Sequence, residues 1–368
     1  MLVLFALFFA AVIAGHFFFA RQAWGQLRGA ADTEIDLDYV RRDDWLAQSF
    51  RSRLAHWTAA PANEAYSRFR VFQAQGERLI ESQQSQAHAK QSSPDIYSFT
   101  NDFACFPESA FARELSVKGN AEVGAQSRLQ AITAGGGLRL GASVTVARWA
   151  DSDGEMTLGP DTQIGARATS RYAIRLSTGA SAKLFSAPLV TTDGYVERFF
   201  DRASVPARAA LRFPLVKGES SALPDVPGKK AAMVQMEENC ILVDGDLHFP
   251  VPVEITTRLV VRGSFSCPSG SLLREDIKAE GDLMVGPESL VVGNLVAGRN
   301  LALYDGCQFE GVLHAGRDLL LAAGVRGRAR RQAVAAYAAE KLYVETNVGV
   351  EGKLAAGEAV RAVKFWRK

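Results

Sequence analysis

The chain has 368 residues, of which 48% are hydrophobic and 22% are charged, so it is long enough for two or three domains and its composition argues against wholesale disorder. The 42 lysines and arginines nearly balance 40 aspartates and glutamates, which argues against a dedicated nucleic-acid binder. Four cysteines and five histidines are too few for a disulfide framework. The 32 glycines exceed average usage, and a regular spacing between them would indicate a repeat.

The first 20 residues are almost purely apolar, and a helix of about 20 residues spans a hydrocarbon core. Arg21 and Arg28 follow this run directly, with Trp24 near the expected interface, and no Lys or Arg precedes it. The sequence therefore predicts a transmembrane helix over 1–20, and the positive-inside rule places the following chain in the cytoplasm. The alternative is a cleaved signal peptide.

Residues 21–95 are expected to form a helical segment beside the membrane. Apolar residues recur at helical spacing from Asp36 to His56, and Pro61 ends this pattern. A second helix is expected from Asn63 to about Gln86. The apolar side of this helical pair is more simply packed against its own protein than used for a partner.

Many of the glycines follow a repeat of about 18 residues, and apolar columns recur in phase with them. Each anchor glycine is expected at a bend between two short strands, where the apolar alternation slips. The spacing is 17 or 18 within two sets, which are Gly119, Gly136 and Gly154, then Gly245, Gly263 and Gly281. Apolar residues stand two positions after each glycine of the second set, and the same spacing of 18 continues for two more coils. We expect this column to form one inward ladder of Leu247, Phe265, Leu283, Leu301 and Leu319.

Alternation of apolar and polar residues predicts strands with one inward face, and an 18-residue repeat predicts coils with about three sides. The expected fold is mainly β, a parallel β-helix solenoid in two blocks over 108–190 and 239–325, with a terminal coil over 343–368. Residues 191–238 break the period as either a linker between two solenoids or a long loop leaving one continuous solenoid. Residues 326–342 are rich in alanine and are expected to form a helical insertion.

The repeats over about 240–325 share a core of the form G-[DNS]-[LF]-x-[VLF] and resemble those of bactofilins, the polymer-forming bacterial cytoskeletal proteins. The resemblance covers about half of the chain. It implies a right-handed β-helix that joins end to end into non-polar filaments without nucleotide. It also implies a membrane-attached scaffold for envelope enzymes, including those that make cell wall or surface polysaccharide. The two blocks, the helical pair and the membrane segment depart from the family pattern.

No catalytic, cofactor-binding or metal-binding residues are expected, and the chain is not expected to be an enzyme. His248 and His314 fall at outward positions of separate coils, where a surface histidine is a simpler interpretation than a general base. The acidic residues occupy outward or turn positions rather than forming a catalytic pair. The cysteines lack the C-x-x-C spacing of a metal site; they are Cys105, Cys240, Cys267 and Cys307.

The expected function is that of a membrane-anchored scaffold that self-associates and organises envelope or surface-polysaccharide machinery. Its expected partners are further copies of itself, the inner membrane and proteins of the envelope or of polysaccharide synthesis, but not nucleic acid. The expected location is the inner membrane, single-pass, with most of the chain in the cytoplasm. The alternative is an exported carbohydrate-binding or carbohydrate-active β-helix, for which Trp149 and Tyr304 are the aromatic candidates. A third possibility is an accessory subunit of a polysaccharide synthase.

Overall fold

The computed structural model describes residues 43–74, 76–87, 94–196, 211–213, 234–237, 240–328 and 334–365. The chain divides into two compact units, Met1–Trp45 and Leu46–Lys368, and the fold described below is that of the second unit. The transmembrane helix expected over 1–20 lies outside the described residues. Within the described ranges, no helix has the length and apolar character needed to span a bilayer.

The described part of the chain contains one helix, α3 (Trp45–Ala59), where the first helix was expected. The second expected helix, from Asn63 to Gln86, is wrong. Its residues form β1 (Glu64–Ala65), β2 (Phe69–Ala74) and β3 (Glu77–Ser82), paired antiparallel. Gly76, at a φ of 78°, makes the tight turn between β2 and β3, which glycine adopts without strain. This turn, the two phenylalanines of β2 and Val71 favour a hairpin over a helix.

The first block is a parallel β-solenoid in which each strand pairs with the strand one coil further on. One side contains β4 (Gln86–Ala87), β6 (Phe103–Cys105), β8 (Ala121–Val123), β10 (Leu138–Leu140), β13 (Met156–Leu158) and β16 (Ala173–Leu176). The other two sides contain β3, β5 (Ile96–Phe99), β7 (Ala110–Val117), β9 (Arg128–Ala134), β11 (Thr145–Val146), β12 (Trp149–Ser152), β14 (Gln163–Ile164) and β15 (Arg167–Ser170). The last coil is a single strand, β17 (Ser181–Thr192), which pairs with β14, β15 and β16 in turn and so passes along all three sides.

The second block has the same construction. One side contains β18 (Leu211–Phe213), β22 (Val253–Ile255), β25 (Leu272–Leu273), β28 (Leu290–Val291), β31 (Gln308–Glu310) and β34 (Arg326–Arg328). The next contains β20 (Cys240–Val243), β23 (Arg258–Val261), β26 (Ile277–Ala279), β29 (Leu295–Ala297), β32 (Leu313–Ala315) and β35 (Val334–Ala338), with β19 (Val234–Glu237) antiparallel to β20. The third contains β21 (Leu247–His248), β24 (Phe265–Cys267), β27 (Leu283–Val285), β30 (Leu301–Leu303), β33 (Leu319–Leu321) and β36 (Lys341–Val344). The final coil is again one strand, β37 (Gly349–Ala362), paired with β34, β35 and β36.

The interior is filled by ladders of apolar side chains. Strand register places the expected ladder residues side by side in successive coils, all buried, and Leu342 extends the series by one coil; they are Leu247, Phe265, Leu283, Leu301 and Leu319. The six anchor glycines lie in the short bends between strands; they are Gly119, Gly136, Gly154, Gly245, Gly263 and Gly281. Gly263 illustrates the need for glycine, because a Cβ there would come within 2.5 Å of the Gly245 carbonyl carbon.

The helix expected over 326–342 is a second wrong prediction, because this segment contributes β34, β35 and the start of β36. The alanines that suggested a helix occupy inward solenoid positions instead. Ala336 is the register partner of Leu313 and Ala338 that of Ala315, and the side chains of both alanines are fully buried. A small side chain at each of these positions fits the ladder, so alanine content here reflects packing in a coil and not helix propensity.

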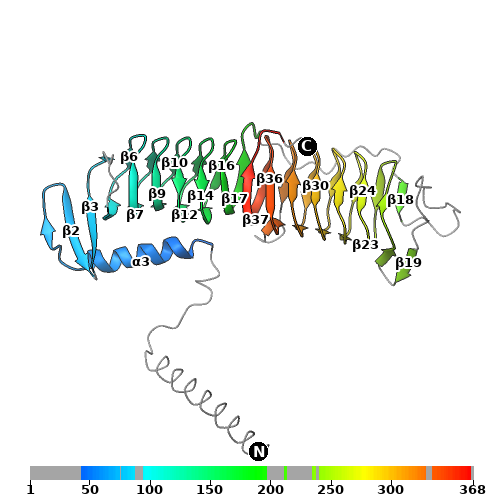
Figure 1. Ribbon diagram of the computed structural model, residues 1–368, viewed down its shortest axis with the longest axis horizontal. Coiled ribbons are helices and arrows are strands. Elements are labelled where there is room, and N and C mark those ends of the chain that lie inside the picture. The colour runs from blue at the N-terminus through cyan, green and yellow to red at the C-terminus, as the bar shows by residue number, and fades with distance from the viewer. Residues whose placement is uncertain are drawn as a thin grey trace, which may run out of the picture. The chain divides into compact units, whose positions relative to one another are not determined.

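The two blocks join into one continuous sheet at their last coils (Figure 1). Strand β17, drawn in green, lies beside β37, drawn in red, and the two are antiparallel from Ser181↔Arg361 to Thr191↔Gly349. The blocks therefore run toward each other, and β18 and β19 lie at the far end of the second block. The two halves thus form one continuous sheet with opposite chain directions, an arrangement that neither alternative for residues 191–238 included.

Candidate functional site

Helix α3 covers one side of the first block. Its buried residues Ala47, Phe50 and Leu54 pack on side chains contributed by strands of neighbouring coils, among them Ile96 and Trp149. The rings of Phe50 and Trp149 meet edge to face, with centroids 5.9 Å apart. This cluster is separate from the solenoid interior. The helix therefore has a small core of its own on the outer surface of the sheet.

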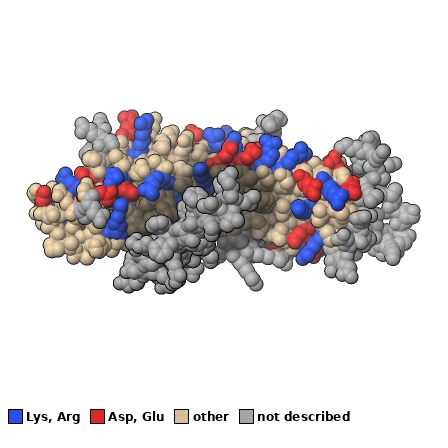
Figure 2. All heavy atoms as spheres, turned by 60° about the horizontal axis from the view of Figure 1, so that its bottom comes forward, with Lys and Arg blue, Asp and Glu red and all other residues tan. Residues whose placement is uncertain are grey.

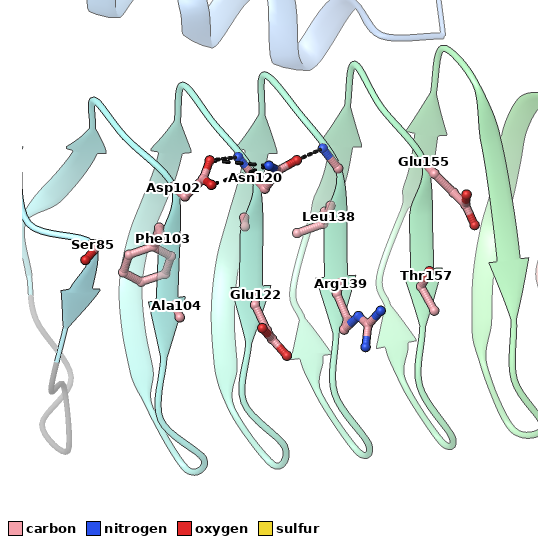
Figure 3. Close-up of a pocket in the computed structure, with 12 residues that line it drawn as sticks. Ser85, Asp102, Phe103, Ala104, Asn120, Glu122, Leu138, Arg139, Glu155 and Thr157 are labelled. Carbon is pink, nitrogen blue, oxygen red and sulfur yellow. Dashed lines mark hydrogen bonds between the residues drawn. The ribbon is translucent and has the colours of Figure 1, made fainter.

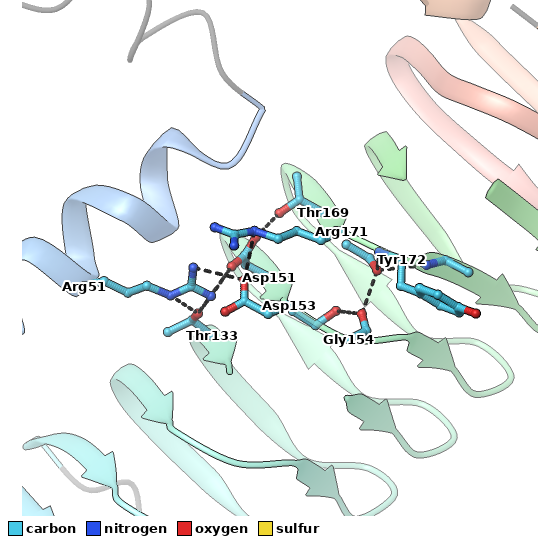
Figure 4. Close-up of polar contacts among 11 residues, drawn as sticks. Arg51, Thr133, Asp151, Asp153, Gly154, Thr169, Arg171 and Tyr172 are labelled. Carbon is cyan, nitrogen blue, oxygen red and sulfur yellow. Dashed lines mark hydrogen bonds and ion pairs between the residues drawn. The ribbon is translucent and has the colours of Figure 1, made fainter. Parts of the chain in front are cut away.

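A polar network lies next to that core (Figure 4). Arg51 of α3 donates to Asp151 Oδ2 at 2.7 Å and to Thr133 Oγ1 at 2.7 and 3.1 Å. Asp151 also accepts hydrogen bonds from Thr133 and Thr169, its register partners in the adjacent coils. The Asp151 side chain is only 5% exposed, so the guanidinium neutralises a carboxylate that water scarcely reaches. We call Arg51, Thr133, Asp151 and Thr169 the Arg51 network.

The Arg51 network was missed by the sequence analysis, although the sequence contains a sign of it. Thr133, Asp151 and Thr169 are spaced by 18 residues and so occupy one column of the repeat. The column lies on the outer surface of the sheet, yet all three residues are buried. A short polar column of this kind indicates a covered face, and the helix that covers it supplies the compensating charge.

A second surface is a shallow groove of about 730 Å³ across several coils of the first block (Figure 3). Asp102 accepts from the Asn120 backbone N–H at 2.7 Å, and Asn120 in turn accepts from the Gly137 N–H at 2.8 Å, so these side chains hold the bends between strands. Glu122 and Arg139, on neighbouring strands, line the open part of the groove. The groove presents a carboxylate and a guanidinium side by side to a polar ligand.

The aromatic candidates for carbohydrate binding do not share a surface. Trp149 is 2% exposed because it packs against Phe50 of α3, whereas Tyr304 is 39% exposed and belongs to the second block. Trp149 therefore cannot stack on a sugar while α3 is in place. The groove is lined by polar side chains together with Phe103, Ala104, Ala121 and Leu138, and its one aromatic ring, that of Phe103, is only 2% exposed.

The two histidines considered as general bases are each held by a neighbour one coil further on. Nδ1 of His248 lies 2.6 Å from Ser266 Oγ, and the ring of His314 lies 5.1 Å from that of Tyr337. The two belong to β21 and β32, on different sides of the second block. The structure does not bring them together.

All four cysteines are free thiols. Cys267 and Cys307 are buried, and burial raises the pKa of Cys267 to about 11 and that of Cys307 to about 12. Cys105 ends β6 and is also buried, and this burial raises the pKa of its thiol. Thiols with raised pKa values are poor nucleophiles and metal ligands. Across the described ranges, no three His, Cys, Asp or Glu residues gather closely enough to hold a metal ion.

Charges on the solenoid surface are mixed in sign. Figure 2 shows basic and acidic side chains next to one another along the face that it presents. Several form ion pairs between neighbouring coils, such as Arg299–Asp282 at 3.2 Å and Arg328–Glu351 at 2.7 Å. Exposed pairs of this kind contribute little stability individually, at about 0–1 kcal/mol.

The third surface is the contact between the two last coils, which we call the joint and define as β17 and β37. Phe185 is the register partner of Leu354, and Val190 that of Val350, and all four side chains are buried. Thr192 strengthens the contact, since its Oγ1 donates to the Glu345 carbonyl at 2.7 Å and accepts from the Val348 N–H at 3.0 Å. The apolar interior thus passes through the joint without a break.

The sequence matches no family model, no curated protein and no solved structure. Three surfaces of the described residues remain as candidate sites: the face covered by α3, the polar groove and the joint. Of these, the joint has the largest contact between distant parts of the chain, because it pairs residues more than 150 positions apart along three sides.

Proposed function

We propose that the chain is a bactofilin-like β-solenoid scaffold that is anchored in the inner membrane by residues 1–20, self-associates, and organises proteins of the envelope or of surface-polysaccharide synthesis. The observation that supports this proposal most directly is the joint. A solenoid end of this sequence accepts another solenoid end by antiparallel pairing along its whole perimeter. An end of that kind is suited to association with further solenoids.

The mechanism we propose is geometric and not catalytic. Outward positions in successive coils are about 4.8 Å apart, because that is the spacing between paired strands. The buried ladders hold these positions in a fixed register, as Leu283 between Phe265 and Leu301 illustrates. Client proteins that bind the outward faces would be held at fixed distances from one another and from the membrane.

The test uses the full chain expressed in its membrane. A fluorescent fusion is expected to form patches or lines at the cell envelope, and the detergent-extracted protein is expected to sediment as assemblies whose size grows with concentration. A matched variant without residues 1–20 should lose the membrane location. A strictly monomeric species at every concentration would contradict self-association, and a uniformly soluble full chain would contradict the anchor.

A second candidate function is supported by the groove. Its polar lining of Asp102, Asn120, Glu122, Arg139 and Thr157 suits the hydroxyl groups of a glycan, as an exported carbohydrate-binding protein would require. A reporter fused after Lys368 distinguishes the two candidates, because activity only in the periplasm favours the carbohydrate-binding protein. Glycan binding that is lost in Glu122→Ala and Arg139→Ala would support it further.

A further inference from the structure

We propose that the chain self-associates by exchanging blocks, so that the second block of one copy pairs at the joint with the first block of another. The inference rests on the self-association in the proposed function, and it names the joint as the surface through which two copies associate. The partner is a second copy of this chain. Three features of the structure support the exchange: the antiparallel strands at the outer ends, the late synthesis of β37 and the length of the connection between blocks.

Short antiparallel strands cover one side of the outer end of each block. In the first block β1 pairs with β2 at Glu64 and Ala65, and in the second block β19 is antiparallel to β20. Short strands of reversed direction are a common way to stop a sheet from growing at its edge. Among the strands that the structure describes, β17 and β37 are those that offer a long edge along all three sides of a coil.

The edge of β17 is complete long before its partner is made. Strand β37 ends at Ala362, about 170 residues after the end of β17 at Thr192. At about 5–20 residues per second, synthesis leaves this edge open for roughly 10–30 s. Phe185 and Val190, which are buried in the joint, belong to the end that is open during this time. A finished second block on a neighbouring chain can then occupy the edge first.

The covalent connection between the blocks does not force them to pair within one chain. Fourteen residues, 197–210, separate the described end of the first block from β18. An extended segment of that length reaches about 50 Å. From β17 to β18 the distance along the second block is seven strand spacings, or about 34 Å. The remaining reach of about 16 Å exceeds the ~10 Å between packed sheets, so it allows pairing with an adjacent copy.

The test is disulfide trapping across the joint. Ser186 and Lys353 are register partners in the antiparallel pair and are only partly buried. Cysteines at directly opposed antiparallel positions lie within disulfide range. Two full-length chains are co-expressed, one with Ser186→Cys and the other with Lys353→Cys, each with a different tag and with Cys240→Ser to remove the most accessible native thiol. A chain with both new cysteines reports pairing within one copy.

Block exchange predicts a covalent dimer that carries both tags, several-fold more abundant than in a control pair of Arg139→Cys and Lys353→Cys. Assemblies that form without this dimer, while the double variant closes its disulfide within one chain, would overturn the exchange and leave the scaffold proposal standing. An absence of assemblies would instead contradict the proposed function. A double variant that forms no disulfide would contradict the joint and the exchange with it.

Discussion

The side chain of Leu283 and that of its neighbour Met284 provide a direct test of the inward ladder. Leu283 is fully buried, whereas Met284 is 42% exposed on the outer surface of the same strand. Leu283→Ala is expected to lower the free energy of unfolding by about 2–5 kcal/mol, because it removes a core contact and leaves a cavity. Met284→Ala should change it by no more than about 0.5 kcal/mol. Denaturant unfolding followed by circular dichroism measures both, and equal midpoints would refute the ladder.

The cysteines differ in the reactivity that their surroundings allow. At pH 8 the native protein is expected to react rapidly with a thiol reagent at Cys240 alone. The raised pKa values of Cys267, about 11, and Cys307, about 12, keep these thiols neutral until the pH approaches those values, and burial also shields Cys105. Mass spectrometry of labelled peptides identifies the sites. Four equally reactive thiols before unfolding would contradict the buried positions, while denaturant should expose all four.

At the scale of single elements, the 18-residue period predicts the strands where it is regular. Where it is interrupted, it does not distinguish a strand from a helix. In 239–325 the glycine bends and apolar columns agree over five coils, and the strands lie where the pattern predicts. In 63–86 and 326–342 the period is interrupted, so the prediction of a helix in these segments depends on the local sequence alone. In the first segment the aromatic residues recur at helical spacing, but the turn at Gly76 and the pairing of β2 with β3 make it a hairpin. In the second segment the alanines fit a helix equally well, and only their pairing with the neighbouring coil shows that they form a strand.

The attachment of α3 depends on Arg51. Arg51→Ala is expected to raise amide hydrogen exchange in α3 by about 10- to 100-fold, because it removes charge-assisted hydrogen bonds from Arg51 to the buried Asp151 that are worth about 1.5–3 kcal/mol. Ser52→Ala, an exposed position on the same helix, is the matched control. Combining Arg51→Ala with Asp151→Asn should recover part of the protection, since the buried side chain at position 151 is then neutral. Unchanged exchange in Arg51→Ala would show that the apolar contacts alone hold the helix.

At the scale of the whole molecule, the reversal of direction between the blocks was not predictable from the sequence. The repeat defines which side chains point inward, and that pattern is the same whichever way a neighbouring coil runs. Register between Phe185 and Leu354 depends on contacts across about 170 residues, for which the period contains no information. For the Arg51 network the period shows the column of Thr133, Asp151 and Thr169, but it contains no information on the helix that packs over that column and supplies Arg51. The membrane anchor over 1–20 stays a prediction of the sequence.

Polar contacts of one arginine next to the joint should affect the stability of the pairing between the two blocks. Arg326 of β34 stacks over the ring of Tyr195 at 4.6 Å and donates to the carbonyl of Val196 at 3.2 Å, both beyond the end of β17. The same guanidinium donates to the side chain of Asn347 at 2.9 Å, just before β37. It therefore links the first block to the last coil of the second.

Arg326→Ala is expected to increase hydrogen exchange in β17 and β37 together, by about 10- to 100-fold, because the segments that follow β17 and precede β37 lose one shared partner worth about 1.5–3 kcal/mol. Arg328→Ala, on the same strand, removes only an exposed pair with Glu351 and should have little effect. If the joint is also the site of exchange between copies, Arg326→Ala should accelerate the formation of mixed dimers in the Ser186 and Lys353 trapping experiment. A faster exchange in β37 without any change in β17 would mean that the two strands do not open as one unit.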